Sequence, residues 1–317
     1  MTGQTLLHFI EAKKQMHRVI VWQDELIDSL FLAVLARGHV LVEWVPGLAK
    51  TLAIETLANV TSLQSSRVQF TPDLLPSDLT GAQIYDQKSW EFVTKHGPIF
   101  ANFVLADEIN RAPSKVQSAL LEAMAEKQVT IWEQSYTLPD PFIVMATQNP
   151  LEQEGTYDLP EAQLDRFLMH VTLGYPTAQE EITIMQRMTM WSFPMVNAVL
   201  ERETIQQAQQ GVDEVTVTDA LYQYVSDLVS TTRNPNDERL AQIIQVGLSP
   251  RASIGLIQLA KAKARLEQRT YVIPDDIKAV AHRVMRHRLI LTYQAISQWV
   301  TKDDCVDRLL DLVPVLK

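Results

Sequence analysis

The sequence has almost no cysteine and no long apolar run. Cys305 is the only cysteine among 317 residues, and a lone cysteine can form neither an internal disulfide nor a cysteine-based metal cluster. No window approaches the roughly 18 consecutive apolar residues of a membrane helix. The segment from Met1 to Ile10 lacks the basic stretch and apolar run of a secretory signal. These absences favour a protein of the reducing cytoplasm and argue against membrane insertion.

An excess of positive charge is also absent. The chain has 28 Lys and Arg against 38 Asp and Glu, a net charge of −10, whereas a duplex-DNA binder usually carries a basic face. One basic stretch, His282 to Arg288, stands out. It is either the face or end of a helix, with Val284 and Met285 on its core side, or a contact for phosphate or an acidic partner. We expect no nucleic-acid partner.

Internal repeats, low-complexity tracts and histidines at metal-ligand spacing are likewise missing. Hydrophobic residues make up 46% and charged residues 21% of the chain, as in ordinary soluble globular proteins. The length suits two domains better than one. The sequence therefore predicts a globular protein of two domains.

Short apolar runs alternate with helical patterns in the first half of the chain. The predicted strands are residues 39–43, 103–106 and 142–146, and the predicted helices are residues 5–37, 51–60 and 114–127. Ser114 and Gln117 form a capping-box pattern at the start of the last helix. Nearly continuous apolar strands that alternate with helices predict an α/β fold, a parallel sheet with helices on both faces.

Two hairpins are predicted to interrupt this alternation. They span about Gln83–Thr94 and Val129–Leu138, and both have β-forming residues on either side of a polar turn. They either decorate the edge of the fold or form surface prongs that touch a substrate or a neighbour.

The second half of the chain has a different character. Almost everything after about Pro176 has helical periodicity, with helices predicted at residues 220–231, 240–246, 253–268, 275–287 and 307–316. We predict a nucleotide-binding α/β domain over residues 1–190 and a smaller all-helical domain over residues 191–317.

A phosphate-binding loop is predicted between the first strand and the helix that follows it. Phosphate binding needs inward backbone N–H groups, a helix N-terminus, a lysine and a hydroxyl for magnesium. The order strand, Pro46–Ala49, Lys50, Thr51, helix supplies each part. The match to the general phosphate-loop pattern is imperfect, because Trp44 and Ala49 stand at its two glycines. A chance loop is the alternative reading of this motif taken alone.

Carboxylates at the end of the next strand strengthen this interpretation. Asp107 can hold magnesium through water, and Glu108 can polarise an attacking water. Asn149, after the following strand, can orient that water without adding charge. Taken singly, the carboxylates could be a solvated strand end and Asn149 a turn former before Pro150.

Two arginines complete the set of candidate catalytic residues. Arg166 follows Asp165, and Arg251 follows Pro250 just before a predicted helix. An arginine can stabilise the charge that develops during phosphoryl transfer. Each arginine alone is more often a surface ion pair, but here five features occur in the expected order.

At this point the sequence closely resembles the MoxR family of AAA+ ATPases. The resemblance covers about residues 18–292. It is carried by 38–41, 45–51, 69–78, 106–113, 146–150 and 154–167, which read GHVL, VPGLAKT, QFTPDLLPSD, ADEINRAP, ATQNP and EGTYDLPEAQLDRF.

The resemblance implies a role for each candidate residue. Val45–Leu52 would hold ATP, with Lys50 and Thr51 as Walker A, and Thr51 and Asp107 would hold Mg²⁺. Asp107 and Glu108 would be Walker B and Asn149 sensor 1. Arg166 would be an arginine finger toward ATP on the adjacent subunit, and Arg251 would be sensor 2. The two hairpins would be the helix-2 insert and the pre-sensor-1 hairpin.

The family also implies an assembly and partners. We expect a homo-oligomer, a hexameric ring, that hydrolyses ATP to mature or remodel a protein complex in the cytoplasm. The expected partners are a client protein and a protein with a von Willebrand factor A domain.

Two departures from the family pattern leave an alternative open. Trp22 and Trp44 stand where the family has glycine, a residue that allows close backbone approach and unusual φ. Each tryptophan either turns outward or alters the pocket, and the ring of Trp22 could stack on the base. The alternative function is a ring scaffold with weakened or absent hydrolysis. A nucleic-acid motor is a third hypothesis, which the acidic balance of the chain disfavours.

Overall fold

The computed structural model describes residues 3–21, 23–44, 50–149, 156–189 and 194–315. The chain divides into two compact units, Met1–Phe167 with Val171–Gln207, and Leu168–His170 with Ala208–Lys317. Helix α8 (Arg202–Asp213) crosses from the first unit to the second. The predicted boundary between the two functional domains, at residues 190 and 191, stays a prediction.

The first unit is built on a five-stranded sheet. Its strand order is β2 (Ser65–Gln69), β5 (Phe103–Asp107), β8 (Ile143–Gln148), β1 (Val40–Trp44) and β9 (Met169–Leu173). The pairs β2–β5, β5–β8 and β8–β1 are parallel. This confirms the predicted α/β fold and adds β2 and β9, which the hydrophobic pattern did not predict.

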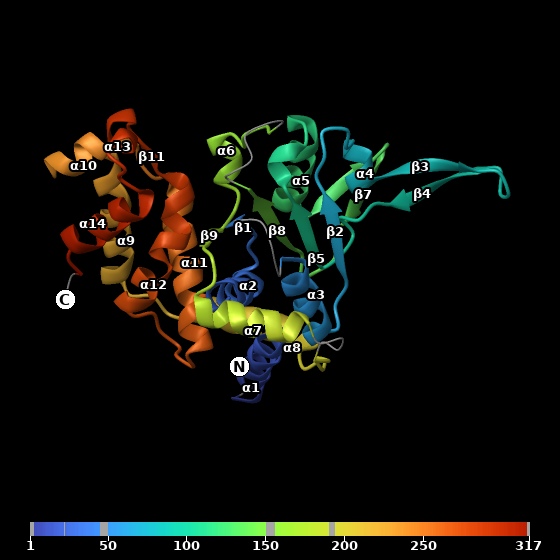
Figure 1. Ribbon diagram of the computed structural model, residues 1–317, viewed down its shortest axis with the longest axis horizontal. Coiled ribbons are helices and arrows are strands. Elements are labelled where there is room, and N and C mark those ends of the chain that lie inside the picture. The colour runs from blue at the N-terminus through green and yellow to red at the C-terminus, as the bar shows by residue number, and fades with distance from the viewer. Residues whose placement is uncertain (1–2, 22, 45–49, 150–155, 190–193, 316–317) are drawn as a thin grey trace. The chain divides into compact units, whose positions relative to one another are not determined.

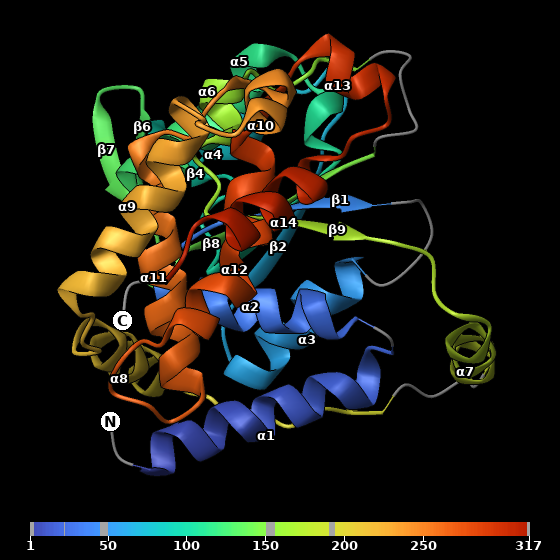
Figure 2. The ribbon, with the colours of Figure 1, turned by 90° about the vertical axis from the view of Figure 1, so that its left-hand side faces the viewer.

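Helices cover both faces of this sheet. Figure 2 shows α1 (Gly3–Val19), α2 (Asp24–Ala36) and α3 (Lys50–Thr61) below strands β1, β8 and β9, with α5 (Ser114–Glu126) above them. All five residues of β5 are buried. Val104 and Ala106 face the core shared with α5, so the alternate residues of the strand face α1–α3. This burial on both faces explains why the central strands are continuous apolar runs.

Both predicted hairpins are present. One consists of β3 (Gly81–Asp86) and β4 (Glu91–His96), and Figure 1 shows it extending away from the sheet, beyond α4 (Pro76–Thr80). The other consists of β6 (Gln128–Ile131) and β7 (Gln134–Thr137). The hydroxyls of Thr94 and Tyr136 lie 3.0 Å apart and link the two hairpins. The two hairpins are therefore joined near their bases.

The predicted capping box at the start of α5 is wrong. Pro113 is the N-cap residue, and no side chain caps this helix end. Gln117 is instead buried, and its Nε2 donates to the carbonyl oxygens of Ile109, Ala112 and Tyr157 at 3.0–3.2 Å. The amide therefore holds the loop around the short 3-10 helix Ile109–Arg111 in place. A buried amide without hydrogen bonds would destabilise the fold, whereas an exposed helix end can bond to water.

A buried histidine links three elements of the first unit. The N–H of Val144 on β8 donates to Nδ1 of His39 at 3.0 Å, and Nε2 of His39 lies 3.2 Å from the carbonyl oxygen of Met124 on α5. Accepting at Nδ1 and donating at Nε2 requires the neutral imidazole. Burial lowers the pKa of His39 to about 4, although the bond to Met124 opposes this and the charge of Lys127 adds to it.

We expect the stability of the protein to fall between pH 7 and pH 5. His39 titrates near 6.5 when unfolded and near 4 when folded, so the unfolded chain binds more protons as the pH falls through 6.5. Linkage then removes about 2 kcal/mol of unfolding free energy between pH 7 and pH 5. Urea unfolding of the wild type and of His39→Gln at both pH values measures this term. An equally steep pH dependence in the variant would assign the effect to other groups.

The second unit is mainly helical. Its helices are α9 (Asp219–Arg233), α10 (Glu238–Ile243), α11 (Pro250–Leu266), α12 (Pro274–Met285), α13 (Tyr293–Ser297) and α14 (Lys302–Leu312). The helix predicted at residues 240–246 ends at Ile243, because β10 (Ile244–Val246) pairs there with β11 (Ile290–Leu291).

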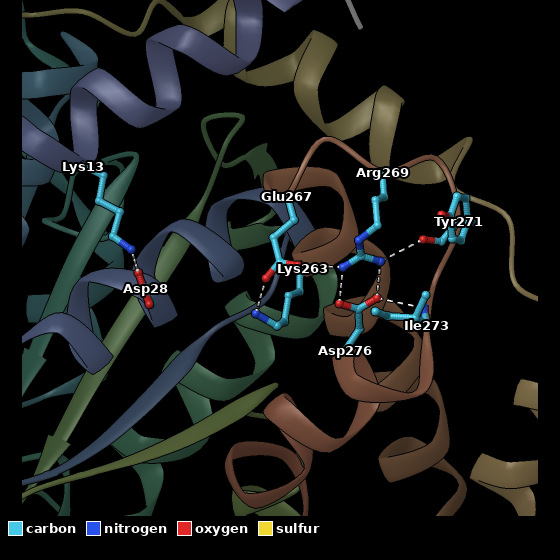
Figure 3. A network of polar contacts seen from close by, with 8 residues as sticks. All are labelled: Lys13, Asp28, Lys263, Glu267, Arg269, Tyr271, Ile273 and Asp276. Atoms are coloured by element: carbon cyan, nitrogen blue, oxygen red, sulfur yellow. Dashed lines mark hydrogen bonds and ion pairs between the residues drawn. The ribbon is translucent and has the colours of Figure 1, made fainter. Parts of the chain in front are cut away.

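An ion network stabilises the loop between α11 and α12 (Figure 3). The carboxylate of Asp276, only 1% exposed, accepts two hydrogen bonds from Arg269 at 2.5 and 2.6 Å and one from the N–H of Ile273 at 2.9 Å. Glu267 joins Arg269 to Lys263. A buried carboxylate with two-point arginine contact and a backbone donor has its desolvation well compensated.

The basic stretch at residues 282–288 forms the last turn of α12 and the short 3-10 helix Arg286–Arg288 that follows it. Arg286 pairs with Asp303 at 2.7 Å and donates to the carbonyl oxygen of His170 at 3.2 Å. Arg288 donates to the carbonyl oxygen of Val284 at 2.5 Å. These contacts lie within the second unit and support the helix-end reading of this stretch.

Candidate nucleotide-binding site

The predicted phosphate-binding lysine is the first residue of α3, the next described element after β1. Helix α3 starts at Lys50, and β1 ends at Trp44. Lys50 and Thr51 therefore lie in the first turn of a helix, where free N–H groups and the helix dipole favour an anion. Several predicted residues of the site lie outside the part of the chain that the structure describes. They are the loop residues Val45, Pro46, Gly47, Leu48 and Ala49, the residue Trp22 and the side chain of Trp44. Leu52 follows in the same helical turn.

Asp107 is the centre of the site. It ends β5, its side chain is 6% exposed, and Lys50 Nζ lies 3.2 Å from its Oδ1. Arg67 on β2 approaches Oδ2 at 2.6 Å, and the Thr147 hydroxyl donates to Oδ1 at 2.7 Å. Burial raises the pKa of Asp107, but the hydrogen bonds from Thr147 and Arg67 and the charge of Lys50 together lower it below its ordinary value. The residue is therefore a buried, ionised carboxylate.

Glu108 has a strained backbone and a tethered side chain. Its φ is 57°, in the left-handed region that residues with side chains rarely adopt. Its N–H donates to Thr147 Oγ1 at 2.9 Å, so one hydroxyl holds both acidic residues. Gln69 Nε2 donates to Glu108 Oε2 at 2.7 Å, and Arg111 Nε lies 3.0 Å from the same oxygen. Backbone strain of this kind concentrates at functional sites.

The remaining predicted residues lie at three places. Asn149 directly follows β8 and is buried, near the end of the strand that carries Thr147. Arg166 follows α6 (Glu161–Leu164), and its NH1 donates to the carbonyl oxygen of Leu121 on α5 at 2.9 Å. Arg251 is in the first turn of α11, in the second unit. The structure thus joins Lys50, Asp107 and Glu108 into one network, and it places Arg166 against α5.

Four residues of this network, Thr147, Arg67, Gln69 and Arg111, were not predicted as site residues from the sequence. Thr147 contacts both acidic residues, Arg67 contacts Asp107, and Gln69 and Arg111 contact Glu108. Thr147 could have been found, because it directly follows the strand predicted at residues 142–146 and precedes Asn149 by two residues. Arg67 and Gln69 could not, because β2 has only one buried residue, Val68, and no apolar run to mark it.

The residues present fit a magnesium nucleotide. An ionised carboxylate, a lysine and a threonine hydroxyl at a helix N-terminus are the donor set that such a ligand requires. The N-termini of α3 and the carboxyl ends of parallel strands β1, β5 and β8 meet at one edge of the sheet, the usual ligand edge of open α/β sheets.

Comparison with known proteins supports this reading. Residues 39–169 match the model of the ATPase family associated with various cellular activities, and residues 236–309 match the AAA lid domain. The chain is 46% identical to Chaperone MoxR1 of Mycobacterium tuberculosis, over 97% of this chain and 82% of that protein. The chain belongs to the MoxR family of AAA+ ATPases.

Two other proteins are similar to this chain along nearly its whole length. The uncharacterised protein YeaC of Bacillus subtilis is 43% identical over 96% of this chain and 94% of its own length. A Cytophaga hutchinsonii protein, crystallised as a candidate ATPase, has a TM-score of 0.93 and 43% identity over 99% of this chain and 97% of its own. These similarities extend over both compact units.

Among the residues that the structure describes, no helix is both long enough and apolar enough to cross a membrane.

Proposed function

We propose that this MoxR-family chain binds ATP with Mg²⁺ and hydrolyses it to drive remodelling of a protein complex. The observation that carries the proposal is the network in which Thr147 joins Asp107 and Glu108 beside Lys50. It supplies a phosphate-binding cation, a metal-binding carboxylate and a second carboxylate within one hydrogen-bonded group.

Each residue has a proposed task. Backbone N–H groups of residues 45–52 and Lys50 hold the phosphates, and Thr51 and Asp107 hold Mg²⁺, which neutralises phosphate charge when bound. Glu108 orients an attacking water and accepts its proton, with Asn149 as the second group on that water. Arg251 contacts the nucleotide from the helical domain that we propose for residues 191–317.

Assembly belongs to the same proposal. Arg166 serves the ATP of an adjacent subunit, so the active form is a ring, which we propose to be hexameric. Chaperone MoxR1 is named as a chaperone, which supports a chaperone-like role toward a client protein. We place this role in the cytoplasm as part of the proposal. A partner with a von Willebrand factor A domain is part of this proposal.

Lys50→Ala should weaken ATP binding by about 10- to 100-fold, because charge-assisted hydrogen bonds to phosphate are lost. Isothermal titration calorimetry with ATP and MgCl₂ measures this, and Lys88→Ala, in the turn between β3 and β4, is the charge-matched control. Equal affinity in the wild type and Lys50→Ala would contradict the proposed site.

The scaffold alternative is favoured by one observation, the tryptophans at positions 22 and 44 in place of family glycines. It predicts no heat of ATP binding for the wild type and a recovered signal in the Trp22→Gly/Trp44→Gly double variant. Binding by the wild type, with hydrolysis, would dismiss this alternative.

A further inference from the structure

Strand β2 places two polar side chains on the acidic pair of the site. β2 is an edge strand of the sheet, and its parallel register sets Gln69 opposite Asp107. Arg67 and Gln69 are two residues apart, so they share one face of the strand. Arg67 NH2 also donates to Gln69 Oε1 at 3.1 Å. One short strand thus contacts both Asp107 and Glu108.

The two oxygens of Asp107 are occupied differently. Oδ1 accepts from Thr147 at 2.7 Å and lies 3.2 Å from Lys50 Nζ. Oδ2 accepts from Arg67 at 2.6 Å, the shortest of the three contacts. If a divalent cation bound to the same carboxylate, it would lie within a few ångströms of the guanidinium on Oδ2. The two positive charges would repel each other strongly there, because the carboxylate is buried.

We propose that Arg67 is a built-in competitor of magnesium at Asp107. The guanidinium neutralises the buried carboxylate while the site holds no Mg²⁺, and it must release Oδ2 before a magnesium nucleotide binds fully. The inference rests on the proposed function, since it concerns the metal of that same site. It adds a positioning residue on β2 that sets how much Mg²⁺ the site needs.

The side chain of Arg67 is freer to move than that of Asp107, as competition with Mg²⁺ requires. The side chain of Asp107 is 6% exposed and is held by Thr147, whereas that of Arg67 is 50% exposed. A long, half-exposed arginine on an edge strand can swing into water at little cost, because a partly exposed ion pair contributes little net stability. When the ion pair breaks, the side chain of Arg67 therefore moves away and Asp107 stays in place.

The test is a magnesium titration of nucleotide binding. Fluorescent mant-ADP is held at a fixed concentration with each protein, and MgCl₂ is added to an EDTA-treated sample at constant ionic strength. For Arg67→Gln we expect the Mg²⁺ concentration at half-maximal binding to fall about fivefold. Arg67→Lys, which keeps the positive charge, should restore most of the wild-type value.

The control must make the same charge change away from the site. Arg202 begins α8 and is exposed, and the N–H of Leu200 beside it donates to the carbonyl oxygen of Val60, at the end of α3 opposite Lys50. Arg202→Gln should therefore leave the magnesium midpoint at the wild-type value. Thermal unfolding by circular dichroism checks that all variants fold.

Three results would overturn the inference. An unchanged midpoint in folded Arg67→Gln would show that Arg67 does not compete with Mg²⁺. A higher midpoint would show that Arg67 assists binding of the metal nucleotide. If the wild type binds no mant-ADP at any MgCl₂ concentration, the proposed function and this inference both fail, an outcome distinct from the other two.

Discussion

Glu108→Gln should lower the ATP hydrolysis rate by about 10²- to 10⁴-fold, the usual contribution of a positioned general base. Glutamine keeps the size of the side chain and one oxygen that can still accept from Gln69 and Arg111, the present partners of Glu108. The fold and ATP affinity should therefore stay close to those of the wild type. Phosphate release measured under saturating ATP and MgCl₂, together with calorimetry, separates loss of chemistry from loss of binding.

A control variant with the same change of charge tests whether the loss of hydrolysis is specific to Glu108. Glu203→Gln removes the same charge from an exposed position of α8 and should leave hydrolysis unchanged. If Glu108→Gln hydrolyses ATP at the wild-type rate, Glu108 is not the base, and its strained backbone has another cause.

Arg166→Ala should lower ATP hydrolysis by about 10³-fold, as loss of an arginine finger does, while each subunit still binds ATP. The physical reason is that transition-state charge on one subunit's phosphate loses the guanidinium of its neighbour. The structure places Arg166 on the carbonyl oxygen of Leu121, so a purely structural role is the competing explanation. Thermal unfolding of Arg166→Ala measures that structural part.

Mixing two inactive variants distinguishes these explanations. In rings made from equal amounts of Glu108→Gln and Arg166→Ala, about a quarter of the interfaces would combine an intact Glu108 with an intact Arg166 from the neighbour, because the contact is head-to-tail. We expect the mixture to recover about that fraction of wild-type hydrolysis. A mixture as inactive as its two components would rule out action between subunits.

The predictions from sequence succeeded where the signal was local in the chain. The strands that end in Asp107 and Gln148 are continuous apolar runs because both faces of the sheet are covered. The hairpins were recognisable because turn residues separate β-forming segments. In each case the information lies within about ten consecutive residues, which is the range over which hydrophobic periodicity acts.

The failures came where distant segments decide the outcome. Strand β2 was missed because an edge strand with one buried residue has no apolar pattern. Gln117 was read as a cap, but its amide serves three carbonyl oxygens from two other segments. Strand β2 depends on its pairing with β5, and the Gln117 amide reaches Tyr157, 40 residues along the chain. The hydrophobic pattern around β2 or Gln117 indicates neither interaction.

The same division holds within the candidate site. The order of strand, loop, Lys50 and Thr51, and of strand, Asp107 and Glu108, is written in consecutive residues, so the sequence alone was enough to predict a phosphate site with an acidic pair. Three partners of that pair, Arg67, Gln69 and Thr147, come from neighbouring strands. Only the parallel register of β2, β5 and β8 brings them together, because register is set by the pairing of whole strands. Only the tertiary structure shows that Asp107 lies between two cations, Lys50 and Arg67. The proposed competition between Arg67 and Mg²⁺ for this carboxylate therefore rests on the tertiary structure and not on the sequence.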